Sequence, residues 1–394
     1  MTKHMNKIEK LIDEICPEGV EFKELGEICT SITAGGDLPE QYIKGQKSPS
    51  NKFPFPIYSN GSEDKALYGF TNDYKINQDA VTISARGTIG FHAVRRAKFT
   101  PIVRLITLIP DNSITVEFLN YVLDITEIGH SGGSIPQLTV PNVKKIKIPI
   151  PLLPIQQEIV KILDTFSALE AELQTELEAR KKQYEYYYDQ VFTFDNKVEI
   201  KKINEVSIVF DSLHQTPKYS DTGFPMIRVT DIKGGYINTE NALKVDRETF
   251  EIFTKKYKPQ FNDIVISRVG SYGNFSLIWQ EEVCLGQNTA IIHPLINAKY
   301  LYYALHSKNV TQFVENNVGG GSQKTISLAS IKEIPIHVPP LTEQQRIVSI
   351  LDKFDALVND ISVGLPAEIN ARRNQYEYYR NKLLTFKPLE KDHA

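Results

Sequence analysis

Residues able to carry out chemistry are few and scattered in this 394-residue chain. The three cysteines, Cys16, Cys29 and Cys284, lie far apart, which excludes a disulfide framework and a cysteine-based zinc site. None of the eight histidines stands at metal-ligand spacing from another on a plausible helix. Walker A, His-Glu-x-x-His, Cys-x-x-Cys and Asn-Pro-Pro-aromatic motifs are all missing. We therefore expect a protein that is not an enzyme, with no metal site and no cofactor of its own.

Composition narrows the class of protein further. The chain has 45 basic and 48 acidic side chains, a formal net charge of −3, and 41% apolar residues. These values are typical of a globular protein and argue against a uniformly basic nucleic-acid binder. No apolar run approaches the roughly 20 residues of a membrane span, and the first ten residues are too polar for a signal peptide. Together with the unpaired cysteines, this predicts a cytoplasmic protein with no membrane partner.

The elements that must position any functional residue are present twice. QQEIVKILDTFSAL, from Gln156, returns 188 positions later as QQRIVSILDKFDAL, with ten of fourteen residues identical. ARKKQYEYYYDQVFTF, from Ala179, returns 192 positions later with nine of sixteen residues identical. The second copy therefore has four extra residues between Leu357 and Ala371. Two collinear matches predict a duplicated unit of about 190 residues, a whole domain plus a connector.

Weaker matches precede the strong ones. Gly87-Thr88-Ile89-Gly90 corresponds to Gly270-Ser271-Tyr272-Gly273, and a Gly-Gly-Ser sequence occurs at 132–134 and at 320–322. Between these points the halves differ, with short β-rich runs at 80–84, 102–109 and 264–267. The sequence thus predicts an α+β protein with a globular segment at 1–150, a helical segment at 151–195, a second globular segment at 196–338 and a second helical segment at 339–394.

The two strong matches have the pattern of long helices. Apolar residues in the first copy follow alternating steps of four and three, the spacing of a coiled-coil seam: Ile155, Ile159, Ile162, Phe166, Leu169 and Leu173. Such a seam must be covered by another apolar surface, and the matching seam of the other copy is the simplest partner. In the second copy, Gly364-Leu365-Pro366 should break or kink the helix, because proline cannot donate a backbone hydrogen bond.

Tyrosine clusters stand on both predicted helices. Because neighbouring tyrosines point in several directions around a helix, one internal seam cannot bury them all. Tyrosine suits half-wet interfaces, which favours a docking site for an external protein, although packing inside the molecule remains the alternative. The partner-binding candidates are Tyr184, Tyr186, Tyr187, Tyr376, Tyr378 and Tyr379.

The order of these motifs carries a family resemblance. Pro149-Ile150-Pro151 or Pro339-Pro340 precedes Gln-Gln, Ile-Val, Ile-Leu-Asp and a tyrosine-rich helix that ends in Thr-Phe. Gly223 to Arg228, with the sequence GFPMIR, is similar to the opening of a target recognition domain, and Phe55-Pro56-Ile57-Tyr58 matches it more weakly. This order, present twice, resembles the specificity subunits (HsdS) of Type I restriction–modification systems over essentially the whole chain.

The resemblance implies a non-catalytic DNA-recognition subunit. Each of two target recognition domains would read one half of a bipartite double-stranded DNA site. The two long helices would pack antiparallel between these domains in a pseudo-twofold repeat, set the half-site spacing and dock two methyltransferase subunits. Motor–nuclease subunits would join that core, and S-adenosylmethionine and ATP would be bound by the partner subunits.

Counting charges by segment reconciles DNA binding with the net charge of −3. The segment 151–195 holds 4 basic and 9 acidic side chains, whereas 1–150 holds 17 of each and 196–335 holds 16 and 14. The predicted reading domains are therefore neutral to slightly basic, and phosphate contacts need only a local basic cluster.

Candidate DNA contacts are side chains whose donors and acceptors suit base edges or phosphates. Arg86 and Arg268 stand beside glycine turns, where the backbone can approach a ligand closely. In the first half the candidates are Ser59, Asn60, Arg86, Thr88, Arg95, Arg96, Lys98, Arg104 and Gln137. In the second half they are Arg228, Thr230, Arg268, Ser271, Tyr272, Gln287, Asn288, Gln323 and Lys324.

Two other functions remain open at this point. One is a helical scaffold that binds only protein or carbohydrate, and the other is an enzyme hidden in the variable segments. Sequence-specific, salt-dependent binding to duplex DNA in a methyltransferase complex would separate the DNA-specificity subunit from the scaffold. Conversion of a nucleic-acid or small-molecule substrate by the purified chain alone would favour the enzyme.

Overall fold

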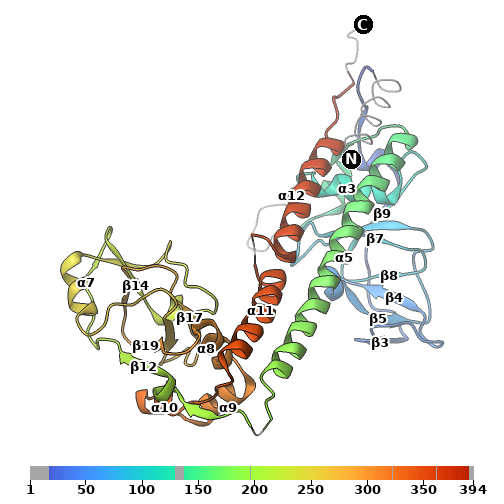
Figure 1. Ribbon diagram of the computed structural model, residues 1–394. Helices are drawn as coiled ribbons and strands as arrows, with labels where there is room; N and C mark the ends of the chain where they lie inside the picture. The colour runs from blue at the N-terminus through green and yellow to red at the C-terminus, as the bar shows by residue number, and fades with distance from the viewer. Residues whose placement is uncertain (1–16, 129–136, 196, 322, 361, 390–394) are drawn as a thin grey trace. The chain divides into compact units, whose positions relative to one another are not determined.

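The computed structural model describes residues 17–128, 137–195, 197–321, 323–360 and 362–389. The chain divides into two compact units: unit 1 comprises Met1–Leu173 and Ile369–Ala394, and unit 2 comprises Gln174–Glu368 (Figure 1). Each unit therefore contains one globular half of the sequence and parts of both helical segments. This division differs from the four segments predicted above, whose boundaries stay predictions.

In the residues that the structure describes, unit 1 is built on three small sheets. A two-stranded sheet pairs β1 (Phe22–Glu24) with β10 (Lys147–Pro149). An antiparallel sheet has the order β2 (Cys29–Ala34), β9 (Ile106–Pro110), β6 (Ala80–Ile83) and β7 (His92–Arg95). Another sheet has the order β3 (Tyr42–Lys44), β5 (Leu67–Thr71), β4 (Phe55–Tyr58) and β8 (Thr100–Pro101), with β4 and β8 parallel. The short helices are α2 (Leu25–Ile28), the 3₁₀ turn η1 (Glu63–Ala66), α3 (Val116–Asp124) and α4 (Val140–Lys144).

Unit 2 repeats this topology strand for strand. Its sheets have the orders β11 (Ile200–Lys202) and β22 (Pro335–His337); β12 (Ser207–Asp211), β19 (Thr289–Pro294), β16 (Ile264–Ser267) and β17 (Phe275–Leu277); and β13 (Tyr219–Ser220), β15 (Lys244–Val245), β14 (Phe224–Ile227) and β18 (Cys284–Leu285). A further hairpin pairs β20 (Val318–Gly319) with β21 (Thr325–Ile326). The short helices are α6 (Ile203–Val206), η2 (Val229–Asp231), α7 (Arg247–Thr254), α8 (Ala298–Leu305), α9 (Lys308–Asn316) and α10 (Leu328–Lys332). The predicted α+β internal repeat is thus confirmed at the level of strand order.

Each core forms where a long helix covers the central sheet. Strands β6 and β16, with the sequences AVTI and IVIS, are buried along their whole length, as expected for central strands rich in β-branched residues. In unit 1 the apolar face of α3 and the first turns of α5 (Leu153–Val191) contribute residues such as Phe118, Ile159 and Leu163 to the same hydrophobic core as β6.

Buried glutamines attach the long helices to the globular parts. Gln156, at the start of α5, accepts a hydrogen bond from the backbone N–H of Thr115, which is the N-cap residue of α3. Gln344, at the start of α11 (Leu341–Val358), accepts one from the N–H of Asn297, the N-cap residue of α8. The repeated Gln-Gln motif therefore has one buried member with the same structural role in both units.

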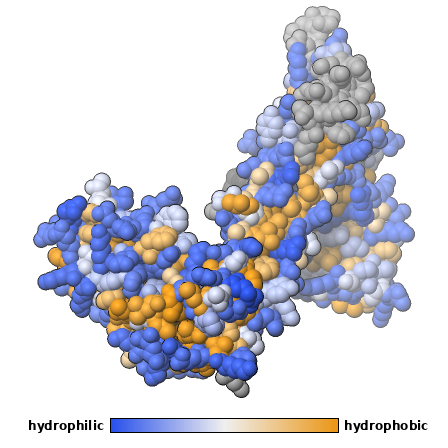
Figure 2. All heavy atoms as spheres, in the orientation of Figure 1, coloured by the Kyte–Doolittle hydropathy of each residue, from blue (hydrophilic) through white to orange (hydrophobic). Residues whose placement is uncertain are grey.

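The helices pair in the antiparallel sense that the resemblance implies. In unit 1, Phe166 of α5 packs against Tyr376 and Tyr379 of α12 (Leu365–Leu384), with ring centroids 6.3 and 5.5 Å apart. In unit 2 the roles are exchanged: Phe354 of α11 stacks on Tyr184 and Tyr187 of α5, at 5.9 and 5.6 Å. The early part of each copy thus meets the late part of the other, and Figure 2 shows hydrophobic side chains along the pair.

The second helical segment is broken, as Gly364-Leu365-Pro366 predicts. Helix α11 ends at Val358 and α12 begins at Leu365, so the four extra residues of the second copy fall in the interruption. A Cβ atom on Gly364 would lie 2.3 Å from the carbonyl oxygen of Ala356, too close for any other residue without movement. Pro366 stands in the first turn of α12, where its missing N–H costs no intrahelical bond.

Replacing Gly364 by alanine should therefore lower the free energy of unfolding of unit 2 by about 1–3 kcal/mol, because the backbone around Ala356 must shift. Urea unfolding followed by circular dichroism measures the effect. Gly321→Ala is the matched control, since no atom lies within 4 Å of its new Cβ. Equal stability of the two variants would show that the interruption does not depend on close contact at Gly364.

Within the part of the chain that the structure describes, no helix has the length and apolar character needed to span a bilayer.

Candidate DNA interface

In unit 1 three loops from different strands meet beside the end of β4. Asn60, which follows β4, accepts a hydrogen bond from the N–H of Ala85 (2.7 Å) and donates one to the carbonyl of Val103 (2.5 Å). Ala85 precedes Arg86 on the β6–β7 turn, and Val103 precedes Arg104 on the loop into β9. Asn60 thus connects the loops that carry both arginines, and its own side chain is used for this structural purpose.

The β6–β7 turn also contacts the segment that follows the Gly-Gly-Ser sequence. The Arg86 guanidinium donates to the Gln137 side-chain oxygen (3.0 Å), and the N–H of Leu138 donates to the carbonyl of Ala85 (3.1 Å). Gly87 and Gly90, on either side of Thr88, have φ of +69° and +86°, a conformation that favours glycine and makes the turn tight. Arg86, Thr88 and Arg104 are exposed, so this corner of unit 1 presents two cations beside amide and hydroxyl groups.

The same constellation recurs in unit 2. The N–H of Arg268 donates to the carbonyl of Asn288 (2.8 Å), and the N–H of Ile326 donates to the carbonyl of Arg268 (2.9 Å). These bonds tie the β16–β17 turn to the loop before β19 and to the segment around Lys324, whose ammonium nitrogen lies 5.9 Å from the centre of the Tyr272 ring.

The turns of the two units match in backbone conformation as well. Gly270 and Gly273 both have φ of +75°, like their counterparts in unit 1. Asn288 and Arg104 occupy the same place before β19 and β9 and both have positive φ, +64° and +62°. Gln287, next to Asn288, donates to the hydroxyl of Thr216 at 3.4 Å. Equivalent positions in the two units therefore present different side chains on one common frame.

Arg95, Arg96 and Lys98 do not belong to these turns but to β7 and the residues just after it. The Arg95 guanidinium stacks on the Tyr58 ring at 4.0 Å and donates to the Thr82 hydroxyl, and burial lowers its pKa. Arg96 pairs with Asp79 and Glu117, both at 2.8 Å, and these bonds raise its pKa. Arg95 is thus packed on β4, and Arg96, although exposed, is paired with two carboxylates.

Two arginines of unit 2 are also engaged within the chain. Arg228 pairs with Asp231 three residues later, at 3.2 Å, and the Thr230 hydroxyl donates to the same carboxylate at 3.4 Å. Arg268 pairs with Asp211 and donates to the carbonyl of Ile326, and its side chain is only 12% exposed. Arg268 thus orders the turn, so the exposed cation near it is Lys324.

Sequence reasoning missed the carboxylates that hold these arginines. Asp231 could have been found, since residues three apart meet in a single 3₁₀ turn. Asp211 lies 57 positions before Arg268, and only the pairing of both strands with β19 brings them together.

Among the tyrosines predicted to bind a partner, two point mainly to solvent. Tyr186 is 61% exposed and Tyr378 is 62% exposed, and they occupy equivalent positions in the repeat. Tyr184, Tyr187, Tyr376 and Tyr379 instead contact the phenylalanines of the opposite helix, as described above.

Within the described residues, no group of three or more His, Cys, Asp or Glu side chains could hold a metal ion.

Comparisons with known proteins identify the frame on which these turns are built. The model of the Type I restriction modification DNA specificity domain matches residues 17–179 and again 195–371. The EcoR124I/EcoR124II specificity subunit of Escherichia coli is 30% identical over 406 residues, which cover 97% of each chain. A putative type I restriction enzyme specificity subunit of Haemophilus influenzae is 35% identical over 276 residues, covering 65% of this chain and 68% of the relative.

Solved structures show that the fold is shared as well. The S subunit of a type I restriction–modification system from M. genitalium has a TM-score of 0.55 at 16% identity, with 93% of this chain and 96% of that chain covered. With these matches, the alternatives of a protein-only scaffold and of a hidden enzyme are set aside. The chain belongs to the family of DNA specificity subunits of type I restriction–modification systems, which recognise DNA sequence and are not themselves enzymes.

Proposed function

We propose that the chain recognises a bipartite duplex DNA target through two reading faces, one in each unit. The reading face of unit 1 consists of Ser59, Arg86, Thr88, Arg104 and Gln137, and that of unit 2 of Ser271, Tyr272, Gln287, Asn288, Gln323 and Lys324. The observation that carries the proposal is the recurrence of one frame of turns with different side chains at equivalent positions. A common frame with different donors and acceptors suits two half-sites of different sequence.

The remaining candidates are not assigned to base recognition. Arg95, Arg96, Arg228 and Arg268 have partners within the chain, which would have to be given up for bidentate pairing with guanine. Lys98 and Thr230 lie near the reading faces in sequence and could contact phosphates without specifying bases.

Competitive binding of the chain in complex with its methyltransferase tests the proposal. A duplex carrying the site that the system methylates should bind at least 10³-fold more tightly than a random duplex. The logarithm of the binding constant should fall linearly with the logarithm of salt concentration. Equal affinity for both duplexes would overturn the two-face assignment.

We also propose that the helix pair docks two methyltransferase subunits, one per unit, and that motor–nuclease subunits join this core. The repeat supports two equivalent contacts, because equivalent surfaces recruit equivalent partners. S-adenosylmethionine and ATP would be bound by those partners, and the assembly would work in the cytoplasm, where its DNA target lies. Tyr186 and Tyr378 are the exposed anchors of this docking.

Replacing Tyr186 and Tyr378 together by alanine should weaken methyltransferase binding at least tenfold, since buried tyrosines are frequent anchors of interfaces. Co-purification and sedimentation velocity of the complex measure the change. Trp279→Ala is the matched control, because this side chain is 59% exposed and lies outside the helix pair. Unchanged co-purification of the tyrosine variant would remove these residues from the docking site.

A further inference from the structure

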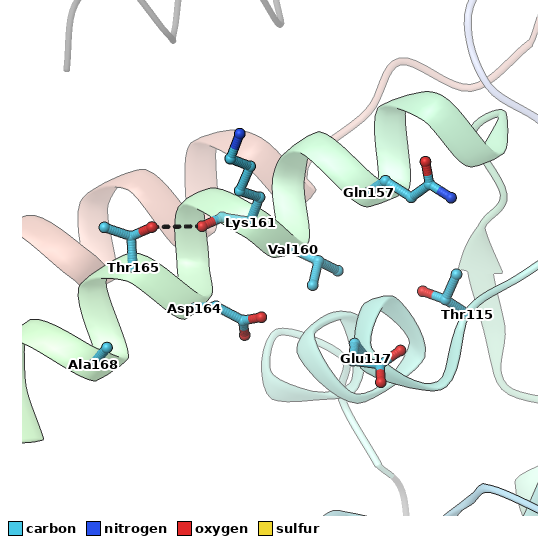
Figure 3. A pocket seen from close by; sticks show the side chains of 8 residues that line it. All are labelled: Thr115, Glu117, Gln157, Val160, Lys161, Asp164, Thr165 and Ala168. Carbon is cyan, nitrogen blue, oxygen red and sulfur yellow. Dashed lines mark hydrogen bonds between the residues drawn. The ribbon is translucent and has the colours of Figure 1, made fainter.

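A groove runs between α3 and α5 in unit 1. The groove is open to solvent, with a volume of about 510 Å³. It is lined by Thr115, the N-cap residue of α3, by Glu117 of α3 and by Gln157, Val160, Lys161, Asp164, Thr165 and Ala168 of α5. Figure 3 shows the Asp164 carboxylate and the Val160 side chain directed from α5 toward α3, where Glu117 lies on the facing helix, whereas Lys161 extends away from α3.

The wall formed by α5 is retained in the other repeat. Gln157, Val160, Asp164 and Ala168 correspond to Gln345, Val348, Asp352 and Ala356, with all four residue types unchanged. The tyrosine that contacts the aspartate is retained too: Tyr121 donates to Asp164 at 2.6 Å and Tyr303 to Asp352 at 2.7 Å. Burial, followed by the hydrogen bond to the carboxylate, raises the pKa of both tyrosines, so they remain donors at neutral pH.

The opposite wall, formed by α3 in unit 1 and by α8 in unit 2, differs in charge between the units. Glu117 is the second residue of α3, and Lys299 is the second residue of α8. Lys299 reaches across to Asp352, with its ammonium nitrogen 2.6 Å from the carboxylate. In the described part of unit 1, Asp164 has no ion-pair partner, and Glu117 pairs with Arg96.

The exchange reverses the net charge of the lining. At corresponding positions, unit 1 presents Glu117, Asp164 and Lys161, whereas unit 2 presents Lys299 and Asp352, with Ser349 in place of Lys161 and Lys353 in place of Thr165. One net negative charge thus becomes one net positive charge, and within the described residues the aspartate is paired with a cation in the second copy alone.

We propose that the groove of unit 1 receives a basic side chain, lysine or arginine, of the methyltransferase subunit that docks there. The ammonium or guanidinium group would stand between Asp164 and Glu117, where Lys299 stands in unit 2, and its methylene stem would pack on Val160 and Ala168. This inference rests on the proposed docking, because the groove lies on the repeated face of α5. It makes the two docking surfaces unequal: the partner on unit 2 meets Lys299 and cannot place the same cation beside Asp352.

Asp164→Asn tests the inference with little change of shape, since the amide oxygen still accepts from Tyr121. We expect one of two bound methyltransferase subunits to bind about tenfold more weakly and the other to be unchanged. Titration of the full chain with the methyltransferase subunit of the same system, followed by native mass spectrometry, counts the bound subunits. Asp352→Asn is the matched control, expected to leave both affinities unchanged.

Glu117→Lys gives a second, independent readout. The new lysine would stand as Lys299 does and close the groove by pairing with Asp164, so it should weaken the same single subunit at least tenfold. If the wild-type chain binds two methyltransferase subunits but neither variant weakens one of them, or if Asp352→Asn has the same effect, this inference is overturned alone. If the wild-type chain binds none, the docking proposal fails, and this inference fails with it.

Discussion

Replacing Gln156 by leucine should lower the free energy of unfolding of unit 1 by about 3 kcal/mol or more. The side chain is fully buried and serves three backbone groups: it accepts from the N–H of Thr115 (3.0 Å) and donates to the carbonyls of Ser113 and Pro151 (both 2.8 Å). Leucine has a similar volume but satisfies none of them, and each buried polar group left without a partner costs about 1–3 kcal/mol.

Urea unfolding monitored by circular dichroism and by the protection of unit 1 amides from hydrogen exchange measures the loss. Gln157→Leu is the matched control, because the neighbouring glutamine is exposed and should change stability by less than about 0.5 kcal/mol. Equal stability of the two variants would mean that α5 is held to α3 by apolar packing alone. The corresponding change, Gln344→Leu, should act on unit 2 by the same route.

The buried glutamines illustrate which features could be predicted from the sequence. The Gln-Gln motif, the aliphatic seam and the tyrosines occur twice because they form the helices and contacts that both units share. The duplication, the α+β class and the interruption near Gly364 could all be derived from those signals. The sequence could not reveal which glutamine is buried, because either one is compatible with the seam's spacing.

The tyrosines show the limit of helical periodicity. Each cluster contains more tyrosine rings than one seam can bury, which predicted that some of them are exposed. It did not predict that Phe166 and Phe354 each pack on tyrosine rings of the opposite copy. That exchange needs the antiparallel pairing, in which residues about 200 positions apart become neighbours, as Glu170 and Arg373 do at 2.7 Å.

The reading faces also combine features that the sequence predicts with features that it does not. The glycine turns could be located from their spacing, since Gly87, Gly90, Gly270 and Gly273 all require positive φ. Which basic residues remain exposed beside them could not be predicted from that spacing. Arg86 immediately precedes its glycine and is exposed, whereas Arg268 stands two residues before its glycine, at the position of the buried Ala85 in unit 1. Arg268 is held there by Asp211, and this contact exists only after the sheet has formed.

Replacing Arg86, Thr88 and Gln137 together by alanine should weaken binding to the specific site about 100-fold and relax recognition at one half-site only. Each well-placed pairing with a base edge contributes about 1–3 kcal/mol of discrimination, and the second frame of turns in unit 2 is untouched. Sequencing of methylated positions in cells carrying the intact system would report the relaxed half-site directly.

The control is Arg96→Ala, which removes a cation that is paired with Asp79 and Glu117 and should change affinity less than about threefold. Relaxation of both half-sites by the triple variant would instead mean that the two units do not read DNA independently.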